Sequence, residues 1–238
     1  MATVIVANDL VGVGKVALTS SLPIMSACQT EVLPLPTVLL SSHTGEFENI
    51  YMRDLTDDLK GFYKQWEHLD FTVDGLVSGY FKSREELKIV GQLARDKRIA
   101  LFVDPIMGDN GRLYQGFDME YVEAMKDFCQ QADAIIPNLT EASLLTDSPY
   151  LEVGSYDKAT VDKLLRDLTK LGPRKVVLTG ISFEEGKIGL AYFDKETNKT
   201  TYLMRKSYKS HFYGSGDLVT AILASGYFHH LNLLKVAN

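Results

Sequence analysis

The sequence lacks the features that mark several large classes of protein. Its 238 residues include only two cysteines, Cys28 and Cys129, without CxxC or CxxH spacing, so we expect reduced thiols rather than a disulfide or a zinc site. No apolar run is long enough for a secretion signal or a membrane span, and no internal repeat is visible. Lysine and arginine form no basic block, and the net charge of −6 argues against nucleic acid or an anionic membrane as a partner. These absences favour a cytoplasmic globular protein.

What is present is the composition of an ordinary globular protein, with 45% hydrophobic and 24% charged residues. No linker rich in proline, glycine or serine divides the chain, so we expect a single domain over residues 1–238. Short apolar runs alternate with segments of helical spacing. The expected strands are 3–7, 31–40, 73–77, 99–103, 134–136 and 175–178, and the expected helices are 15–28, 56–68, 83–96, 118–131, 140–145, 159–171 and 218–228.

This alternation predicts an α/β fold, with a three-layer, doubly wound and mostly parallel sheet that carries helices on both faces. The runs 187–193 and 200–204 add a small antiparallel hairpin near the C-terminal part of the chain. Pro34 and Pro36 indicate that 31–40 is an irregular or edge strand. Ligands of such sheets bind beyond the carboxyl ends of the strands, so we expect functional residues in the loops there.

The most informative of these loops is Gly214-Ser215-Gly216-Asp217, directly before an apolar helix. The glycines allow a tight turn whose N–H groups point one way, and the helix adds its positive N-terminal end, so the junction can bind an anion. A carboxylate repels phosphate, and Asp217 there suits a general base that takes a proton from an attacking hydroxyl group. The junction alone fits equally well a helix start at which Asp217 is favoured by the dipole.

A second polar cluster follows the expected strand that ends at Val103. Asp104 and Asp109 lie on a loop that also contains Pro105 and Gly108. Two carboxylates at this place can hold a hydrated metal ion near phosphate groups. A plain turn with solvated aspartates explains the same residues.

Two more clusters follow later strands. Asn138 and Glu141 are three residues apart across a helix start, so both can face one point, and an amide with a carboxylate suits the water ligands of Mg²⁺. A cap formed by Thr140 explains this pattern as well. Thr179 and Gly180 permit close approach of a nucleotide phosphate, although in isolation a plain turn explains these two residues better.

Taken in order, these clusters resemble the ribokinase-like superfamily. Within it, the segments 43–45, 79–80, 104–109 with Tyr114, and 214–217 resemble the pyridoxal (pyridoxamine) kinase family, and the segment 8–18 resembles bacterial pyridoxamine kinases. The resemblance covers nearly the whole chain. It implies ATP-dependent phosphorylation of the 5′-hydroxymethyl group of vitamin B6, that is, of pyridoxal, pyridoxamine or pyridoxine, in the salvage of pyridoxal phosphate.

The same resemblance implies a role for each matching residue. Asp217 would be the base, and the N–H groups of Gly214, Ser215 and Gly216 would contact the transferred phosphoryl group. The implied substrate contacts are Asn8, Thr44, Gly45, Tyr80 and Asp217. The implied nucleotide site is Asp104, Asn138, Glu141, Thr179, Gly214, Ser215 and Gly216, and the implied metal set is Asp104, Asp109 and Glu141. The implied cofactors are ATP and Mg²⁺, with a monovalent cation such as K⁺, and the implied assembly is a homodimer.

One departure from the family concerns the C-terminus. Only twelve residues follow Gly226, whereas relatives continue further, so we expect a chain shortened at this end. Two alternatives stay open at this stage. Hydroxymethylpyrimidine kinase of thiamine synthesis shares the same motif logic and a similar ring alcohol, and a non-catalytic B6-binding protein could keep the fold.

Overall fold

The computed structural model describes residues 1–45, 47–208 and 212–236. These residues form two compact units. Unit 1 consists of Met1–Phe102 and the C-terminal segment 212–236, and unit 2 consists of residues 103–208. The expectation of one domain over residues 1–238 stays a prediction. Among the described residues, no helix is both long and apolar enough to cross a membrane.

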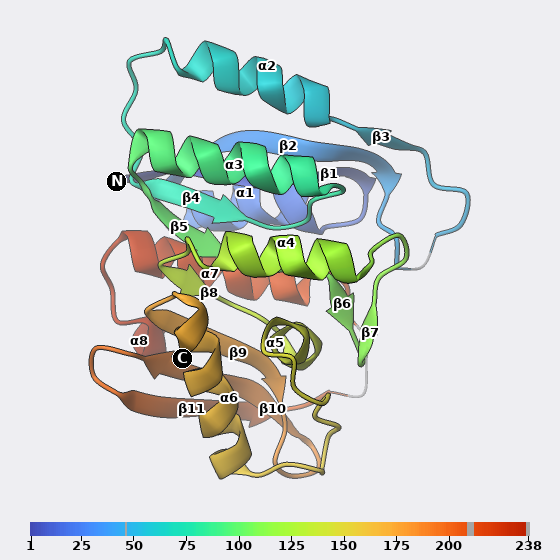
Figure 1. Ribbon diagram of the computed structural model, residues 1–238, viewed down its shortest axis with the longest axis vertical. Helices are drawn as coiled ribbons and strands as arrows, with labels where there is room; N and C mark the ends of the chain where they lie inside the picture. Colours follow the sequence, from blue (N-terminus) through green and yellow to red (C-terminus); the bar gives the residue numbers. More distant parts are fainter. Residues whose placement is uncertain (46, 209–211, 237–238) are drawn as a thin grey trace. The chain divides into compact units, whose positions relative to one another are not determined.

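The strands of unit 1 lie in the order β5-β4-β1-β2-β3 (Figure 1). They are β1 (Ala2–Val13), β2 (Thr30–Ser42), β3 (Met52–Asp54), β4 (Gly75–Ser78) and β5 (Ala100–Val103), whose last residue belongs to unit 2. β1 is parallel to β2 and β4, and β3 is antiparallel to β2. Apolar runs such as Val4-Ile5-Val6 are fully buried because helices cover both faces.

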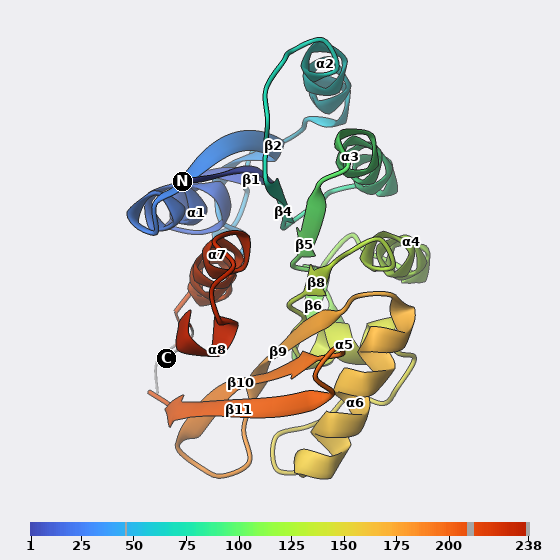
Figure 2. The same ribbon diagram turned by 90° about the vertical axis from the view of Figure 1, so that its left-hand side faces the viewer.

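The helices of unit 1 lie on the two faces of these strands (Figure 2). On one face, α1 (Ala17–Ala27) packs against α7 (Ser215–Phe228), and on the other α2 (Thr56–Trp66) packs against α3 (Arg84–Lys97). Helix α3 begins with a capping box, in which the Glu86 N–H donates to Ser83 Oγ over 3.3 Å and the Ser83 N–H donates to the Glu86 carboxylate. A short helix that the sequence pattern did not predict, α8 (Leu233–Val236), follows α7.

Unit 2 contains strands in the order β8-β9-β10-β11 and a separate pair, β6-β7. Its elements are β6 (Gly108–Asp109), β7 (Arg112–Leu113), α4 (Met119–Cys129), β8 (Ala134–Ile135), α5 (Leu139–Leu145), α6 (Lys158–Leu171), β9 (Lys175–Ile181), β10 (Lys187–Asp194) and β11 (Lys199–Lys206). β8 and β9 are parallel, whereas β10 is antiparallel to both β9 and β11. The predicted α/β fold is confirmed, with parallel strand pairs, helices on both faces and the expected antiparallel hairpin, here β10–β11.

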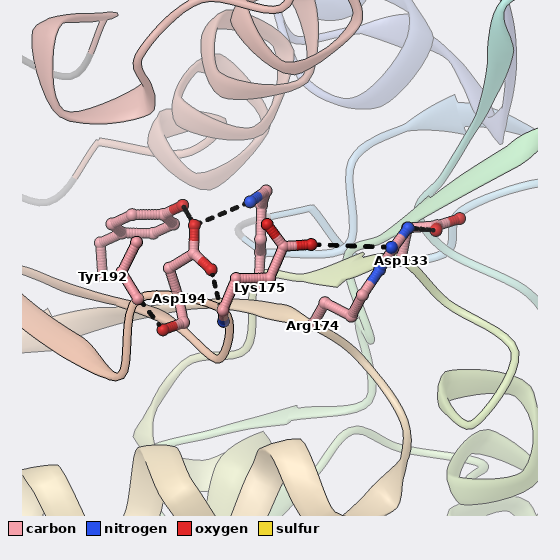
Figure 3. Close-up of polar contacts among 7 residues, drawn as sticks. Asp133, Arg174, Lys175, Tyr192 and Asp194 are labelled. Atoms are coloured by element: carbon pink, nitrogen blue, oxygen red, sulfur yellow. Dashed lines mark hydrogen bonds and ion pairs between the residues drawn. The ribbon is translucent and has the colours of Figure 1, made fainter.

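Charged side chains tie the strands of unit 2 together at the end where β8 and β9 begin (Figure 3). The Asp194 carboxylate accepts hydrogen bonds from Lys175 Nζ over 2.8 Å and from the Tyr192 hydroxyl over 3.0 Å, and Arg174 donates to Asp133 over 2.9 Å. Burial alone would raise the pKa of Asp194, but the bonds from Lys175 and its neighbours hold that pKa below its usual value. These contacts fix how β8, β9 and β10 lie beside one another. The residues that follow the carboxyl ends of β8 and β9 therefore have defined positions.

Two strands differ from their sequence-based predictions. The first, β1, runs on through Asn8 and Asp9 to Val13, although these polar residues interrupt the apolar run from which its end was predicted. The second, β2, is an inner strand and not an edge strand, since β1 and β3 flank it, but its register against β1 shifts within residues 36–39, as the alternative of an irregular strand predicted. Among the described residues, β3 pairs only with Val38–Leu40, so Pro34 and Pro36 have β1 as their one partner strand. Because no strand lies beside these two prolines on the β3 side, their missing N–H groups cost no hydrogen bond there.

Candidate functional site

The turn before α7 is held in one conformation by a glycine. Gly214 caps the helix with a φ of 80°, and a Cβ atom there would overlap with the carbonyl oxygen of Lys15. The position therefore requires glycine for both its left-handed backbone and its close approach to Lys15. Helix α7 starts at Ser215, earlier than predicted, so Asp217 lies in its first turn rather than before it. The N–H groups of Ser215 and Gly216 are among those that a helix start leaves without intrahelical partners.

Asp217 is half-buried, and two specific donors reach its carboxylate. They are the backbone N–H of Ala17, at the start of α1, and the side-chain amide of Asn8, on β1. Burial raises the pKa of Asp217, and these two hydrogen bonds partly oppose that rise. Ala17 has a φ of 49°, in the left-handed region that costs alanine roughly 1–2 kcal/mol. The fold thus maintains an unfavourable backbone conformation at a residue that binds Asp217.

Asn8 connects three parts of unit 1. Its Oδ1 atom accepts the N–H of Tyr80 over 2.8 Å and the N–H of Asp9 over 3.0 Å, while its amide donates to Asp217. Gly79 makes room for this side chain, because a Cβ atom at that position would overlap with it. The structure therefore brings together three of the predicted site residues, Asn8, Tyr80 and Asp217.

Sequence reasoning missed Asp9. Its side chain is only 8% exposed, and burial, with a contribution from the nearby Asp217 charge, raises its pKa to about 7. The register of β1 against β2 shifts at this residue, where Thr37 and Val38 both lie opposite Asp9. Such a bulge redirects side chains and is common beside functional sites. An acidic residue within an otherwise apolar strand is the sequence signal that could have identified it.

The loop after β2 packs against the residue that precedes Gly214. The His43 ring lies 4.7 Å from the Tyr213 ring and 4.9 Å from the Phe47 ring. The Tyr213 hydroxyl donates to the Gly45 carbonyl oxygen over 3.1 Å. A Cβ atom at Gly45 would overlap with the Tyr213 ring, so only glycine permits this approach. Thr44, in the same loop, is exposed.

In unit 2, Asn138 and Glu141 form a capping box at the start of α5. The Glu141 N–H donates to Asn138 Oδ1 over 2.9 Å, and the Asn138 N–H donates to Glu141 Oε2 over 2.8 Å. The cap is thus Asn138, not Thr140, whose hydroxyl instead accepts the Gly111 N–H over 2.9 Å. The second oxygen of Glu141 accepts the Met107 N–H over 3.2 Å. Both oxygens of this carboxylate are therefore fixed in place.

The three carboxylates of the predicted metal set lie within electrostatic reach of one another. Glu141 is buried, and its pKa is raised well above the usual value by burial and then by the charges of Asp104 and Asp109. Asp104 is buried, whereas Asp109 is exposed and accepts hydrogen bonds from Asn110. Within the described ranges, no group of three such side chains is arranged to enclose a metal ion. The metal set stays a prediction.

Thr179 lies beside Asn138, which follows the end of β8, and the two residues form a parallel β-bridge. The register of β9 against β10 shifts at the next residue, Gly180, which has a φ of 74°, and a Cβ atom added there would meet none of the described atoms within 4 Å. The Thr179 N–H donates to the Pro137 carbonyl oxygen over 2.9 Å. Four of the predicted nucleotide-site residues therefore lie in one region of unit 2, namely Asp104, Asn138, Glu141 and Thr179.

Comparison with known proteins adds independent information. Residues 56–237 match the family model described as phosphomethylpyrimidine kinase. The pyridoxal kinase of Dictyostelium discoideum is 28% identical over 212 residues, which span 81% of this chain and 67% of that protein. A similar protein of Saccharomyces cerevisiae, described as a candidate pyridoxal kinase, is 28% identical over 79% of this chain and 62% of its own length. The chain thus spans between 62% and 71% of the length of such relatives.

Solved structures give higher coverage. The crystal structure of pyridoxal kinase from Lactobacillus plantarum has a TM-score of 0.91 and 33% identity, over 100% of this chain and 84% of that one. A Bacteroides thetaiotaomicron protein, described as a candidate phosphomethylpyrimidine kinase and solved with pyridoxal, has a TM-score of 0.93 and 32% identity over 99% of this chain and 83% of that one. The chain therefore belongs to the phosphomethylpyrimidine kinase family, and within this family of ribokinase-like proteins it groups with the pyridoxal kinases.

Proposed function

We propose that this chain is a pyridoxal (pyridoxamine) kinase that transfers the γ-phosphoryl group of ATP to the 5′-hydroxymethyl group of a B6 vitamer. The observation that carries the proposal is the environment of Asp217. This carboxylate is half-buried at the start of α7, beside the Gly214 turn, and Asn8 and Ala17 hold it in place. The similarity to a B. thetaiotaomicron protein solved with pyridoxal favours a B6 vitamer over a pyrimidine as the alcohol.

In this proposal unit 1 binds the alcohol. Asp217 accepts the proton of the 5′-hydroxyl group as that oxygen attacks phosphorus, and its raised pKa brings it closer to a useful base strength. The N–H groups of Gly214, Ser215 and Gly216, together with the N-terminal end of α7, stabilise the charge on the transferred phosphoryl group. Asn8, Thr44, Gly45 and Tyr80 contact the pyridine ring.

Unit 2 binds the nucleotide in the same proposal. Asn138 and Thr179 are neighbours at a strand end where phosphate can approach Gly180 closely. The donor set fits Mg²⁺, since Asp104 and Glu141 are buried carboxylates that repel each other and would be relieved by a divalent cation. Asp109 would complete this set. When bound with the nucleotide, Mg²⁺ neutralises charge on the phosphate oxygens. A monovalent cation such as K⁺ belongs to the proposal as an activator.

The proposal includes a cytoplasmic homodimer that acts in the salvage of pyridoxal phosphate. Cys28 and Cys129 are free thiols, which suits a reducing compartment. Apolar side chains exposed around the β2–β3 edge supply a surface for a second copy. They are Val13, Leu39, Phe47, Tyr51 and Met52. Sedimentation equilibrium tests this part, and a monomer at micromolar concentration would contradict it.

The activity is tested by incubating the protein with Mg-ATP and, separately, pyridoxal, pyridoxamine, pyridoxine and hydroxymethylpyrimidine. We expect a phosphate ester of at least one B6 vitamer, detected by mass spectrometry. Product from the pyrimidine alone would assign the chain to thiamine synthesis instead. Binding of a vitamer without any product would make it a non-catalytic B6-binding protein.

A further inference from the structure

The Asp9 carboxyl group has an unusual place in unit 1, because it is buried beside a second carboxyl group. Its side chain is 8% exposed and lies near enough to Asp217 for the two charges to repel. It also lies near Tyr80, whose pKa is raised to about 12 by burial and then by the charge of Asp9. Asp9 therefore lies within electrostatic reach of two predicted contacts of the B6 ring.

Within the part of the chain that the structure describes, this carboxyl group has no partner that would explain its burial. Among the described residues, no side chain donates a hydrogen bond to Asp9 or forms an ion pair with it, and only its own backbone N–H opposes the rise of its pKa. Buried carboxylates in folded proteins are ordinarily paired with a cation or with several donors, since an unpaired one costs stability. Ordinary helix capping does not explain it, because Asp9 lies within a strand.

The backbone maintains this arrangement. Asn8 Oδ1 accepts the Asp9 N–H, and the register shift against β2 falls at Asp9. The same Asn8 side chain holds Tyr80 and Asp217. One residue thus binds the backbone of Asp9, the backbone of Tyr80 and the carboxylate of Asp217, so the two acids belong to one structural arrangement.

We propose that Asp9 is a specificity-determining residue of the acceptor pocket, whose carboxylate binds the positive charge of an amine-bearing substrate alcohol. The inference rests on the proposed function and deepens it. Among the B6 vitamers, pyridoxamine carries a primary ammonium group at the 4′ position, where pyridoxine carries a neutral hydroxyl group. Primary alkylamines are protonated at neutral pH, as lysine is. An ammonium group next to Asp9 is attracted by that carboxylate and reduces its repulsion with Asp217, whereas the hydroxyl group of pyridoxine does neither.

The test compares pyridoxamine with pyridoxine in the wild-type protein and in Asp9→Asn, by equilibrium binding and by steady-state kinetics. The two ligands share the ring and the 5′-hydroxyl group, so pyridoxine serves as the internal control for folding and for Asp217. We expect the wild type to bind pyridoxamine more tightly. Asp9→Asn should reduce this preference by roughly 10- to 100-fold, the range for a hydrogen bond to a charged group. Pyridoxine should keep its affinity within about threefold.

Each outcome decides the question. An unchanged ratio of the two dissociation constants in Asp9→Asn would overturn the proposal. If both ligands lose affinity equally, the ratio also stays unchanged, and Asp9 then has a structural role. Binding is measured apart from turnover. A wild type that binds both ligands but forms no ester would refute the kinase activity, and its binding ratio would still support or refute the role of Asp9. A wild type that binds neither vitamer would refute both.

Discussion

The side-chain amide of Asn8 donates a hydrogen bond to the Asp217 carboxylate, which links β1 to the first turn of α7. The other end of the same amide accepts the backbone N–H groups of Asp9 and Tyr80. The orientation of the Asn8 amide is therefore determined, because its oxygen is occupied by two donors and only its nitrogen can face Asp217. A proton acceptor held in this way needs no rearrangement before an alcohol binds next to it.

Asp217→Asn should leave nucleotide binding nearly unchanged and lower kcat by roughly 10²- to 10⁴-fold, because the amide cannot accept the proton of the alcohol. The measurement is steady-state phosphorylation of a B6 vitamer beside a nucleotide-binding titration. Asp58→Asn is a matched control, since Asp58 occupies the same third position of α2 but is exposed. If a helix-start preference were the whole explanation of Asp217, both variants would lose a little stability and neither would lose turnover.

Two glycines of the turn should respond differently to substitution by alanine. Gly214→Ala places a Cβ atom against the Lys15 carbonyl oxygen and strains a φ of 80°, so it should lower Tm and abolish activity. Gly216→Ala meets no atom of the described residues within 4 Å, so its Tm should match or exceed that of the wild type. Any loss of activity in Gly216→Ala then reports on space that the phosphoryl group occupies. Thermal melts of both variants with an activity assay check this, and equal Tm losses would refute it.

Most of the α/β fold was predictable from the sequence, because apolar runs and helical spacing locate elements to within a few residues. The spacing of Ser83 and Glu86 in the sequence matches the capping box of α3, whereas the cap of α5 is Asn138 and not the expected Thr140. The course of β1 was not, because Asn8 and Asp9 are polar and yet lie inside a strand. Their burial depends on Tyr80 and Asp217, which are distant in sequence, so no local pattern reports it.

The residues of the candidate site were predicted from the order of their motifs along the chain, because a sequence alone does not show which residues are in contact. Asn138 and Glu141 illustrate the limit of this approach. Their spacing suggested both a shared ligand and a helix cap, and the structure shows a reciprocal cap with Glu141 buried against Asp104. The capping role does not exclude a functional one, because the second oxygen of Glu141 accepts the Met107 N–H and its carboxylate lies near the charges of Asp104 and Asp109. Only the surroundings of Glu141, which come from other loops, distinguish the two.

The stability of the protein should depend on the protonation of Asp9. Folding raises the pKa of this carboxyl group from 3.8 to about 7, so the folded state binds its proton more tightly than the unfolded chain between these values. The free energy of unfolding should therefore fall as the pH rises from about 4 to about 7, and the cost should be complete above pH 7. Asp9→Asn removes this cost, which is at most about 4 kcal/mol.

Urea unfolding at pH 5 and at pH 8 measures the effect. We expect Asp9→Asn to be more stable than the wild type at pH 8, with a smaller difference at pH 5. Glu86 and Asp217 also have raised pKa values, so the wild type as a whole should be less stable at pH 8, and only the difference between the two proteins isolates Asp9. An equal shift at both pH values would show that the carboxyl group is not buried as described.

The loop after β2 should control binding of the B6 vitamer through its contact with Tyr213. Gly45→Ala would push the Tyr213 ring away and disturb its contact with the His43 ring, so we expect the KM for the vitamer to rise about tenfold or more, with the KM for ATP nearly unchanged. Tyr213→Phe is the milder companion, because it keeps the ring and removes only the hydrogen bond to Gly45, worth about 1 kcal/mol. Gly61→Ala is the control for substitution itself, since Gly61 is helical and an added Cβ atom meets nothing within 4 Å in the described part of the chain. Since the displaced ring immediately precedes Gly214, an effect confined to the nucleotide would contradict this coupling.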